Sequence, residues 1–398
     1  MESNQEIAYD YLLGNEQERY SEVLRKAYPD QFFFFFPERL KWLPHLGDDR
    51  LPVLTARCGS QTAAWVWLQK SPVFVDGTII NDAFFSVNTF TLAEFRRRGI
   101  GVQLQQRAAS AHRLFWSISM SSANRRNRQR LGWQDGVPLH EYCLRIGKFD
   151  REKLFCGLFD YCRRKRRYVL GGLLRLADLL GGGWLAYRLI DFHFPKWQLG
   201  QSKNDLLFRE ISLYGGEWDV LWGRIRREYR FGVNRDSAWM NWSYVTQPHL
   251  RFSRYAVLRD GKWIGTVVFR AFEDGEMPHG IVTELLTEPG ENESTYRDIL
   301  QYAVRKLSER GCQYVYLGLS DKKYEHVLRG IGFRCLGHLV PMYHFQNEAG
   351  EPLTLPDGKW LMSLGDQDIA QYVRGRHPSA KQMLKMMWVK NETDHQCR

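Results

Sequence analysis

The run FRRRGIGVQ places three arginines, Arg96 to Arg98, directly before Gly99 and Gly101 and a stretch that reads as a helix. Glycine permits tight turns and lets backbone amides approach a ligand closely. The free N–H groups and the dipole at a helix start favour an anion such as pyrophosphate. Because a predicted strand precedes the arginines, the junction has the context of a phosphate-binding loop, although a solvated basic face is the alternative.

Two carboxylates are the best placed to act as a base. Asp82 begins a predicted strand, and Glu284 lies inside the otherwise apolar run IVTELL. An unpaired carboxylate in a buried strand is costly. Glu284 is therefore expected either to take part in catalysis or to pair with a neighbouring arginine.

The sequence predicts no metal site. Its seven cysteines are scattered without a C-x-x-C pair, which favours reduced thiols and argues against structural zinc. His338 and His344, expected on one terminal strand, have no cysteine or carboxylate at ligand spacing, so they read as ordinary strand residues.

The net charge of +11 suits acidic partners: nucleic acid, anionic lipid or a polyphosphate cofactor. The basic residues are dispersed, so no specific nucleic-acid partner is predicted. Neither a secretory signal nor an apolar span of about 18 residues is visible, which predicts a cytoplasmic protein. One basic run could touch anionic lipid headgroups or simply be a solvated connector: Arg163, Arg164, Lys165, Arg166 and Arg167.

The order of predicted elements repeats along the chain. After three strands between residues 52 and 92, the first half continues with a helix from Gly99, a strand at 113–120, a helix at 122–133 and a last strand at 140–147. The second half has a hairpin around Asp260-Gly261, a strand at 279–287, a helix, a strand, a helix and a last strand at 335–345. The fold class is thus α/β with α+β character: two similar units in tandem, each a mostly antiparallel twisted sheet flanked by helices.

The predicted divisions follow this repeat. A first domain spans 1–148, a basic, glycine-interrupted helical connector 149–203, a second domain 204–347 and a C-terminal extension 348–398. The aromatic run 32–36 is expected to pack under the first helix, with a pocket wall as the alternative.

The first half resembles the GNAT superfamily of acyl-CoA-dependent N-acyltransferases. Arg96, Gly99 and Gly101 satisfy the family signature [QR]-x-x-G-x-[GA], and the resemblance runs from about residue 51 to 146. It implies that acetyl-CoA, or another acyl-CoA, binds the first half, whereas the second half lacks the glycine loop. The implied cofactor-binding residues are Thr89, Phe90, Thr91, Leu92, Arg96, Arg97, Arg98, Gly99, Ile100, Gly101, Val102 and Asn124.

The resemblance also exposes departures from the family. The tyrosine that many members use to protonate the departing thiolate is replaced by Arg128 in the first half and by Leu328 in the second. Asn124 could cap its helix instead of meeting the cofactor.

The segments SAWMNWSYVTQP and GKWLMSLGDQD resemble tandem GNAT proteins of bacterial polysaccharide-biosynthesis clusters, and the arrangement is similar to mycothiol synthase and Fem-type aminoacyltransferases. The implied activity is acetyl transfer to an amine of an amino sugar or similar cell-envelope precursor. A degenerate CoA-binding scaffold and Fem-like aminoacyl transfer are the alternatives. The acceptor is expected between the halves, near Glu284 and the rings of residues 239–244.

Overall fold

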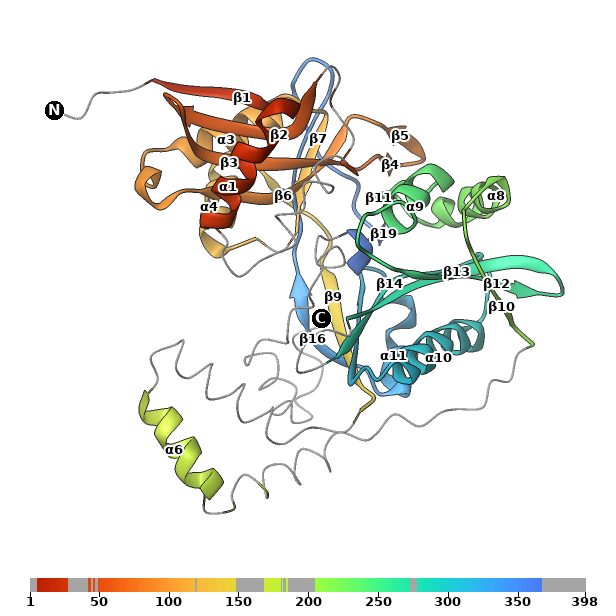
Figure 1. The fold of residues 1–398 in the computed structure, drawn as a ribbon. Helices are drawn as coiled ribbons and strands as arrows, with labels where there is room; N and C mark the ends of the chain where they lie inside the picture. Colours follow the sequence, from red (N-terminus) through yellow and green to blue (C-terminus); the bar gives the residue numbers. More distant parts are fainter. Residues whose placement is uncertain are drawn as a thin grey trace.

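The computed structural model describes residues 6–27, 42–43, 46, 49–118, 120–147, 168–179, 181, 184, 205–272 and 278–366. Two large twisted sheets dominate this part of the chain, and a smaller sheet lies between them (Figure 1). The prediction of a mixed α/β fold with two similar, mostly antiparallel units is confirmed.

The first large sheet comes mainly from the N-terminal half. Its strands, in spatial order, are β1 (Ile7–Leu13), β2 (Arg50–Cys58), β3 (Gln61–Lys70), β6 (Ala83–Thr91), β7 (Leu114–Ser117), β17 (Met342–Gln346) and β18 (Pro352–Leu353), with β8 (Gln134–Asp135) beside β17. Helices α1 (Gln17–Ala27), α3 (Ile100–Ser110) and α4 (Ser122–Arg130) belong to this half. Only β6 and β7 pair in parallel, because α3 carries the chain across between them.

The second large sheet has the same plan. Its strands, in order, are β10 (Leu207–Glu210), β12 (Ser253–Arg259), β13 (Lys262–Phe272), β14 (His279–Thr287), β15 (Tyr314–Leu319), β9 (Leu139–Arg145) and β16 (Arg334–Leu339). The parallel pair is β14 and β15, joined through α10 (Glu293–Glu309), and α11 (Glu325–Ile331) follows.

The two halves exchange strands. β9, which was expected to close the first sheet, lies in the second, between β15 and β16. The expected single strand 335–345 is two strands: β16 stays in the second sheet, and β17 crosses to pair with β7. Pro341 lies between them, where a proline cannot donate to a continuous ladder. His338 and His344 are consequently in different sheets.

A third sheet also joins the halves. It is formed by β19 (Trp360–Leu361), β11 (Phe231–Val233), β4 (Val73–Val75) and β5 (Thr78–Ile80), in that order, and α8 (Gly216–Ile225) and α9 (Ser237–Tyr244) lie on the second-half side of it (Figure 1). One continuous apolar core contains Trp65 and Trp116 from the first half with Trp218 and Trp360 from the second. The halves therefore share a core, unlike independently folded domains.

Within the predicted connector, α6 (Tyr168–Leu179) lies away from both large sheets (Figure 1). No described helix is long and apolar enough to cross a bilayer. The basic run 163–167 and the aromatic run 32–36 fall outside the described residues. The divisions at residues 148, 203 and 347 stay predictions.

Because each large sheet needs a strand from the other half, we predict that residues 1–147 do not fold alone. Circular dichroism and urea unfolding of this fragment should show no cooperative transition. Co-expression with residues 205–398 supplies the missing strands and should give a soluble complex. A folded, monomeric 1–147 fragment would contradict the shared core.

Candidate functional site

The first half contains a slot where β6 and β7 diverge. The parallel ladder joins Ala83, Phe84 and Phe85 to residues 114–116 and ends there, while β6 stays paired with β3 on its other edge as far as Thr91. The register slips between Val87 and Phe90, and Asn88 has a positive φ of 44°. This bulge bends β6 away from β7. Beyond residue 85, no described strand pairs with the edge of β6 that faces β7, so this edge is a candidate surface for a ligand.

Four of the predicted cofactor-binding residues lie along this edge, at the end of β6. Thr89, Phe90, Thr91 and Leu92 are all half-buried, as expected for the wall of a slot. Leu92 N–H bonds back to Ala63 O at 3.0 Å, so the opposite edge is already satisfied.

The arginine-glycine loop forms a compact turn at this end of the slot. Arg97 and Gly99 both have left-handed backbones, with φ of 66° and 77°, and α3 begins at the next residue, Ile100. Among the described residues, the amides of 97–101 have no hydrogen-bond acceptor. Left-handed residues next to free amides form anion-binding concavities, and a helix start adds its positive dipole end.

Gly101 decides how closely α3 approaches the strand. A Cβ atom there would lie 2.8 Å from Thr91 Oγ1, inside ordinary contact distance. Arg96 Nε donates to Thr91 O at 3.1 Å and its guanidinium lies over the Phe90 ring, so this side chain ties the loop to β6. Arg97 has no side-chain partner in the described part of the chain and is exposed, available to a phosphate. The loop, including Arg98 and Val102, thus fits a pyrophosphate.

Asn124 does not cap its helix, because Ser121 is the N-cap of α4. The Asn124 side chain instead accepts a hydrogen bond from Gln105 Nε2 at 2.7 Å. Gln105 Oε1 in turn accepts from Arg128 Nε at 3.0 Å, and Arg128 Nη2 donates to Ser86 Oγ at 2.9 Å. One polar chain therefore crosses the slot from α4 to β6. Gln105 and Ser86 carried no signal in the sequence, since neither belongs to a motif.

Asp82 lies at the other end of β6 from the arginine-glycine loop. It precedes the first residue of the strand and is seven residues from Thr89, about 20 Å along an extended chain. One oxygen lies 2.9 Å from His112 Nδ1, and the other accepts the Arg113 N–H at 2.8 Å. The contacts fix the turn between α3 and β7, which favours a structural role.

Glu284 is fully buried in a cluster of charges. Arg235, equally buried, donates from Nε to Glu284 at 3.0 Å and from Nη2 to Asp366 at 2.6 Å. Tyr244 Oη donates to the other oxygen of Glu284 at 2.7 Å. The arrangement is the alternative expected from the sequence, a neighbouring arginine. Burial raises the pKa of Glu284 to about 7; the negative charge of Asp366 adds to this rise, and the positive charge of Arg235 opposes it.

This cluster holds the C-terminal segment in the gap between β14 and β15. Those strands pair over residues 279–282 and 314–317 and then diverge, as in the first half. Ser320 N–H donates to Met362 O at 3.2 Å, and Leu319 pairs with Ser363. Residues 360–366 thus occupy the gap between β14 and β15, whereas no described strand pairs with β6 in the corresponding gap of the first half. Residues 358–366 of the motif GKWLMSLGDQD close the second unit, and its last two residues lie outside the described residues. The sequence placed this segment only in a C-terminal extension.

The aromatic residues of α9 are used in packing. Trp239 and Tyr244 are buried. Trp242 stacks on Trp42 with ring centroids 4.2 Å apart, and each indole N–H donates to the other residue's carbonyl oxygen. These contacts favour a structural role over stacking on a sugar.

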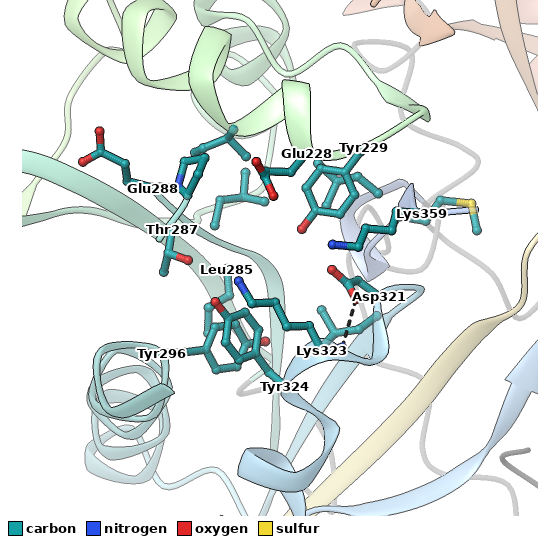
Figure 2. Close-up of a pocket in the computed structure, with 16 residues that line it drawn as sticks. Glu228, Tyr229, Leu285, Thr287, Glu288, Tyr296, Asp321, Lys323, Tyr324 and Lys359 are labelled. Atoms are coloured by element: carbon teal, nitrogen blue, oxygen red, sulfur yellow. Dashed lines mark hydrogen bonds between the residues drawn. The ribbon is translucent and has the colours of Figure 1, made fainter. Parts of the chain in front are cut away.

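A polar pocket remains beside the filled gap of the second half. Figure 2 shows the Tyr229 hydroxyl, the Lys323 and Lys359 amines and the Asp321 carboxylate directed into one space. In place of an arginine-glycine loop, the segment after β14 carries Glu288, which pairs with Arg224 at 2.7 Å. Lys262 also pairs with Glu288, at 3.1 Å, so this carboxylate is neutralised by two cations.

In the part of the chain that the structure describes, no group of three or more histidine, cysteine, aspartate or glutamate side chains is arranged to hold a metal ion.

The fold is similar to that of solved acetyltransferases. A GCN5-related N-acetyltransferase from Anabaena variabilis superposes with a TM-score of 0.56 and 9% identity, covering 87% of this chain and 74% of that one. A probable N-acyltransferase from Enterococcus faecalis gives 0.52 and 11%, covering 85% and 72%. No protein-family model and no curated protein matches the sequence. The GCN5-related N-acetyltransferase (GNAT) fold is therefore present, as two units in tandem.

The buried Glu284 predicts an unusual pH dependence of stability. Its pKa in the folded protein is about 7, above the ordinary value of 4.5, so the folded state holds its proton more tightly. The free energy of unfolding should therefore fall between about pH 4.5 and pH 7, by up to about 3 kcal/mol. Glu284→Gln should flatten this fall in urea titrations. Glu22→Gln, at an exposed position of α1, is the control; equal slopes in all three proteins would contradict the assignment.

Proposed function

We propose that this protein is an acyl-CoA-dependent N-acyltransferase that binds acetyl-CoA, or another acyl-CoA, in its first half alone. The proposal is supported by two neighbouring features of the first half, the edge of β6 and the arginine-glycine loop that follows this strand. The part of β6 that extends beyond its ladder with β7 ends at the arginine-glycine loop, where the five amides of residues 97–101 have no acceptor among the described residues. A ligand with both a peptide-like arm and a pyrophosphate matches that combination.

Different residues of the slot would bind different parts of acyl-CoA. The amides of 97–101 and the arginines would hold the phosphates, and the β6 edge at 89–92 would pair with the arm. Bound acyl-CoA supplies a thioester: the amine nitrogen bonds to its carbonyl carbon, the C–S bond breaks with the electron pair on sulfur, and the amine proton passes to water or a base. An unpaired amide of β6 can donate to the carbonyl oxygen as charge develops.

The finer assignment, an amine of an amino sugar or similar cell-envelope precursor as acceptor, rests on the resemblance of SAWMNWSYVTQP and GKWLMSLGDQD. A CoA-binding scaffold without activity is the competing proposal. It draws support from the engagement of Asp82 and Glu284 in other contacts. Binding of CoA with no acylated product from any amino sugar would favour the scaffold.

We predict that replacing Arg97 and Arg98 together with alanine weakens acetyl-CoA binding 10- to 100-fold, because two exposed cations beside the free amides are lost. Isothermal titration calorimetry measures the change, and mass spectrometry of amino-sugar mixtures then detects product.

The matched control is Arg297→Ala, an exposed arginine near the start of α10, the corresponding helix of the second half. It should bind acetyl-CoA like the wild type. Equal weakening by both changes would show that net charge, and not the loop, governs binding.

We also propose that the connector touches an anionic membrane surface. On α6, Val169, Leu173, Leu176 and Leu179 are exposed, and they recur at a spacing that places them on one side of the helix. Five basic residues at 163–167 immediately precede this helix. Apolar insertion combined with basic attraction is how interfacial helices bind anionic lipid.

The test is co-sedimentation with vesicles. The protein should pellet with phosphatidylglycerol vesicles and stay in solution with phosphatidylcholine vesicles or at high salt. Replacing Leu173 and Leu176 with glutamate should abolish pelleting. The control replaces Leu207 and Leu213, exposed leucines outside α6. If the protein still pellets with the vesicles after the α6 leucines are replaced, the proposal is contradicted.

A further inference from the structure

Arg128 of α4 is a buried positive charge that no carboxylate neutralises among the described residues. Arg128 is fully excluded from solvent, and its two hydrogen-bond acceptors, Gln105 Oε1 and Ser86 Oγ, are uncharged. Its Nη1 is buried without an acceptor in the described part of the chain. The guanidinium lies 4.3 Å from the Trp133 ring centroid, and this cation–π contact offsets only part of the cost of burial.

Arg235, which is fully buried as well, is neutralised by neighbouring carboxylates. Arg235 meets Glu284, Asp366, Ser363 and a backbone carbonyl, so all three of its nitrogens are satisfied. Arg128 has no ionic partner of this kind in the part of the chain that the structure describes. An uncompensated buried charge is costly and concentrates at functional sites. The contrast indicates that the counter-charge of Arg128 comes from a ligand.

The position of Arg128 relative to β6 indicates which part of a ligand would lie near it. Ser86 is the first residue of β6 beyond the ladder with β7, and its hydroxyl lies 3.1 Å from that of half-buried Thr89. The arginine-glycine loop follows the other end of this part of β6. Arg128 is therefore at the end of the slot away from the phosphate site, on the side of the reacting end of an acyl-CoA.

We propose that Arg128 binds the negative charge on the CoA sulfur as the thiolate leaves, by electrostatic stabilisation instead of proton donation. The proposal rests on the proposed function. A cation beside a thiol favours the thiolate, and exclusion of water strengthens the effect. Burial lowers the pKa of Arg128 to about 9, so the side chain remains a cation near neutral pH.

The test measures the ionisation of bound CoA by the ultraviolet absorbance of its thiolate during a pH titration. In the wild type, the thiol pKa should fall by about one unit or more below that of free CoA, near 8.5 for an ordinary thiol. Arg128→Met should remove the shift. Arg128→Lys, which keeps a charge, should restore part of it. Arg126→Met, on an exposed arginine of the same helix, should behave like the wild type.

Thermal unfolding separates this role from a structural one. Methionine removes an uncompensated buried charge, so Arg128→Met should keep or raise the Tm. An unshifted thiol pKa in the wild type, or a Tm that falls in Arg128→Met while the shift persists, would overturn the proposal.

A third arm addresses the other source of negative charge, a carboxylate on the acyl group. If succinyl-CoA binds tenfold more tightly than acetyl-CoA and Arg128→Met removes that preference, Arg128 serves the acyl carboxylate, and the thiolate assignment is wrong. Calorimetry of the wild type with CoA tests the proposed function separately from the role of Arg128. No binding at all refutes the proposed function, whereas binding with an unshifted thiol refutes only the role of Arg128.

Discussion

Two parallel strands that separate part-way along their length leave backbone N–H and C=O groups without partners, and an interior cannot leave such groups unpaired. Both halves of this protein contain that separation, at β6/β7 and at β14/β15, and each resolves it differently. In the second half, the chain itself fills the gap with residues 360–366. In the first half, no described strand covers the edge of β6 beyond its ladder with β7, and the arginine-glycine loop follows the end of that edge. The asymmetry between two similar folds thus follows from where one C-terminal segment lies.

Two buried arginines mark these two solutions. Arg235 is neutralised by carboxylates from β14 and from the C-terminal segment, so its charge fastens the segment in place. Arg128 sits in the open unit among uncharged acceptors. Both arginines are equally buried. Arg235 is neutralised by two carboxylates, whereas the hydrogen-bond acceptors of Arg128 among the described residues carry no charge. Burial alone does not separate the two cases; the charge of the neighbours does.

Local patterns predicted most of the elements and the arginine-glycine loop, because alternation, helical periodicity and glycine placement act over a few residues. The strand exchange was not predictable in this way: β9 alternates equally well beside either β7 or β15, and only the packed whole selects its partner. Glu284 was noticed as an anomaly in an apolar strand, but its partner Arg235 and the second carboxylate bound to that arginine, Asp366, lie 49 and 82 residues away, beyond any local pattern. The contact of Asn124 with Gln105 was not predictable either, because no motif marks Gln105, and the cofactor role of Asn124 stays a prediction.

The exchange of β17 also sets the order of events during synthesis. β7 is complete at residue 117, but the strand that covers its edge begins at Met342, 225 residues later. At a translation rate of 5–20 residues per second, this edge waits roughly 10 to 45 s on the ribosome. An uncovered strand edge is a template for pairing with other chains, so the nascent protein carries an aggregation-prone surface for most of its synthesis. Early folding of the first half is therefore provisional, and chaperones that shield strand edges have a long interval in which to act.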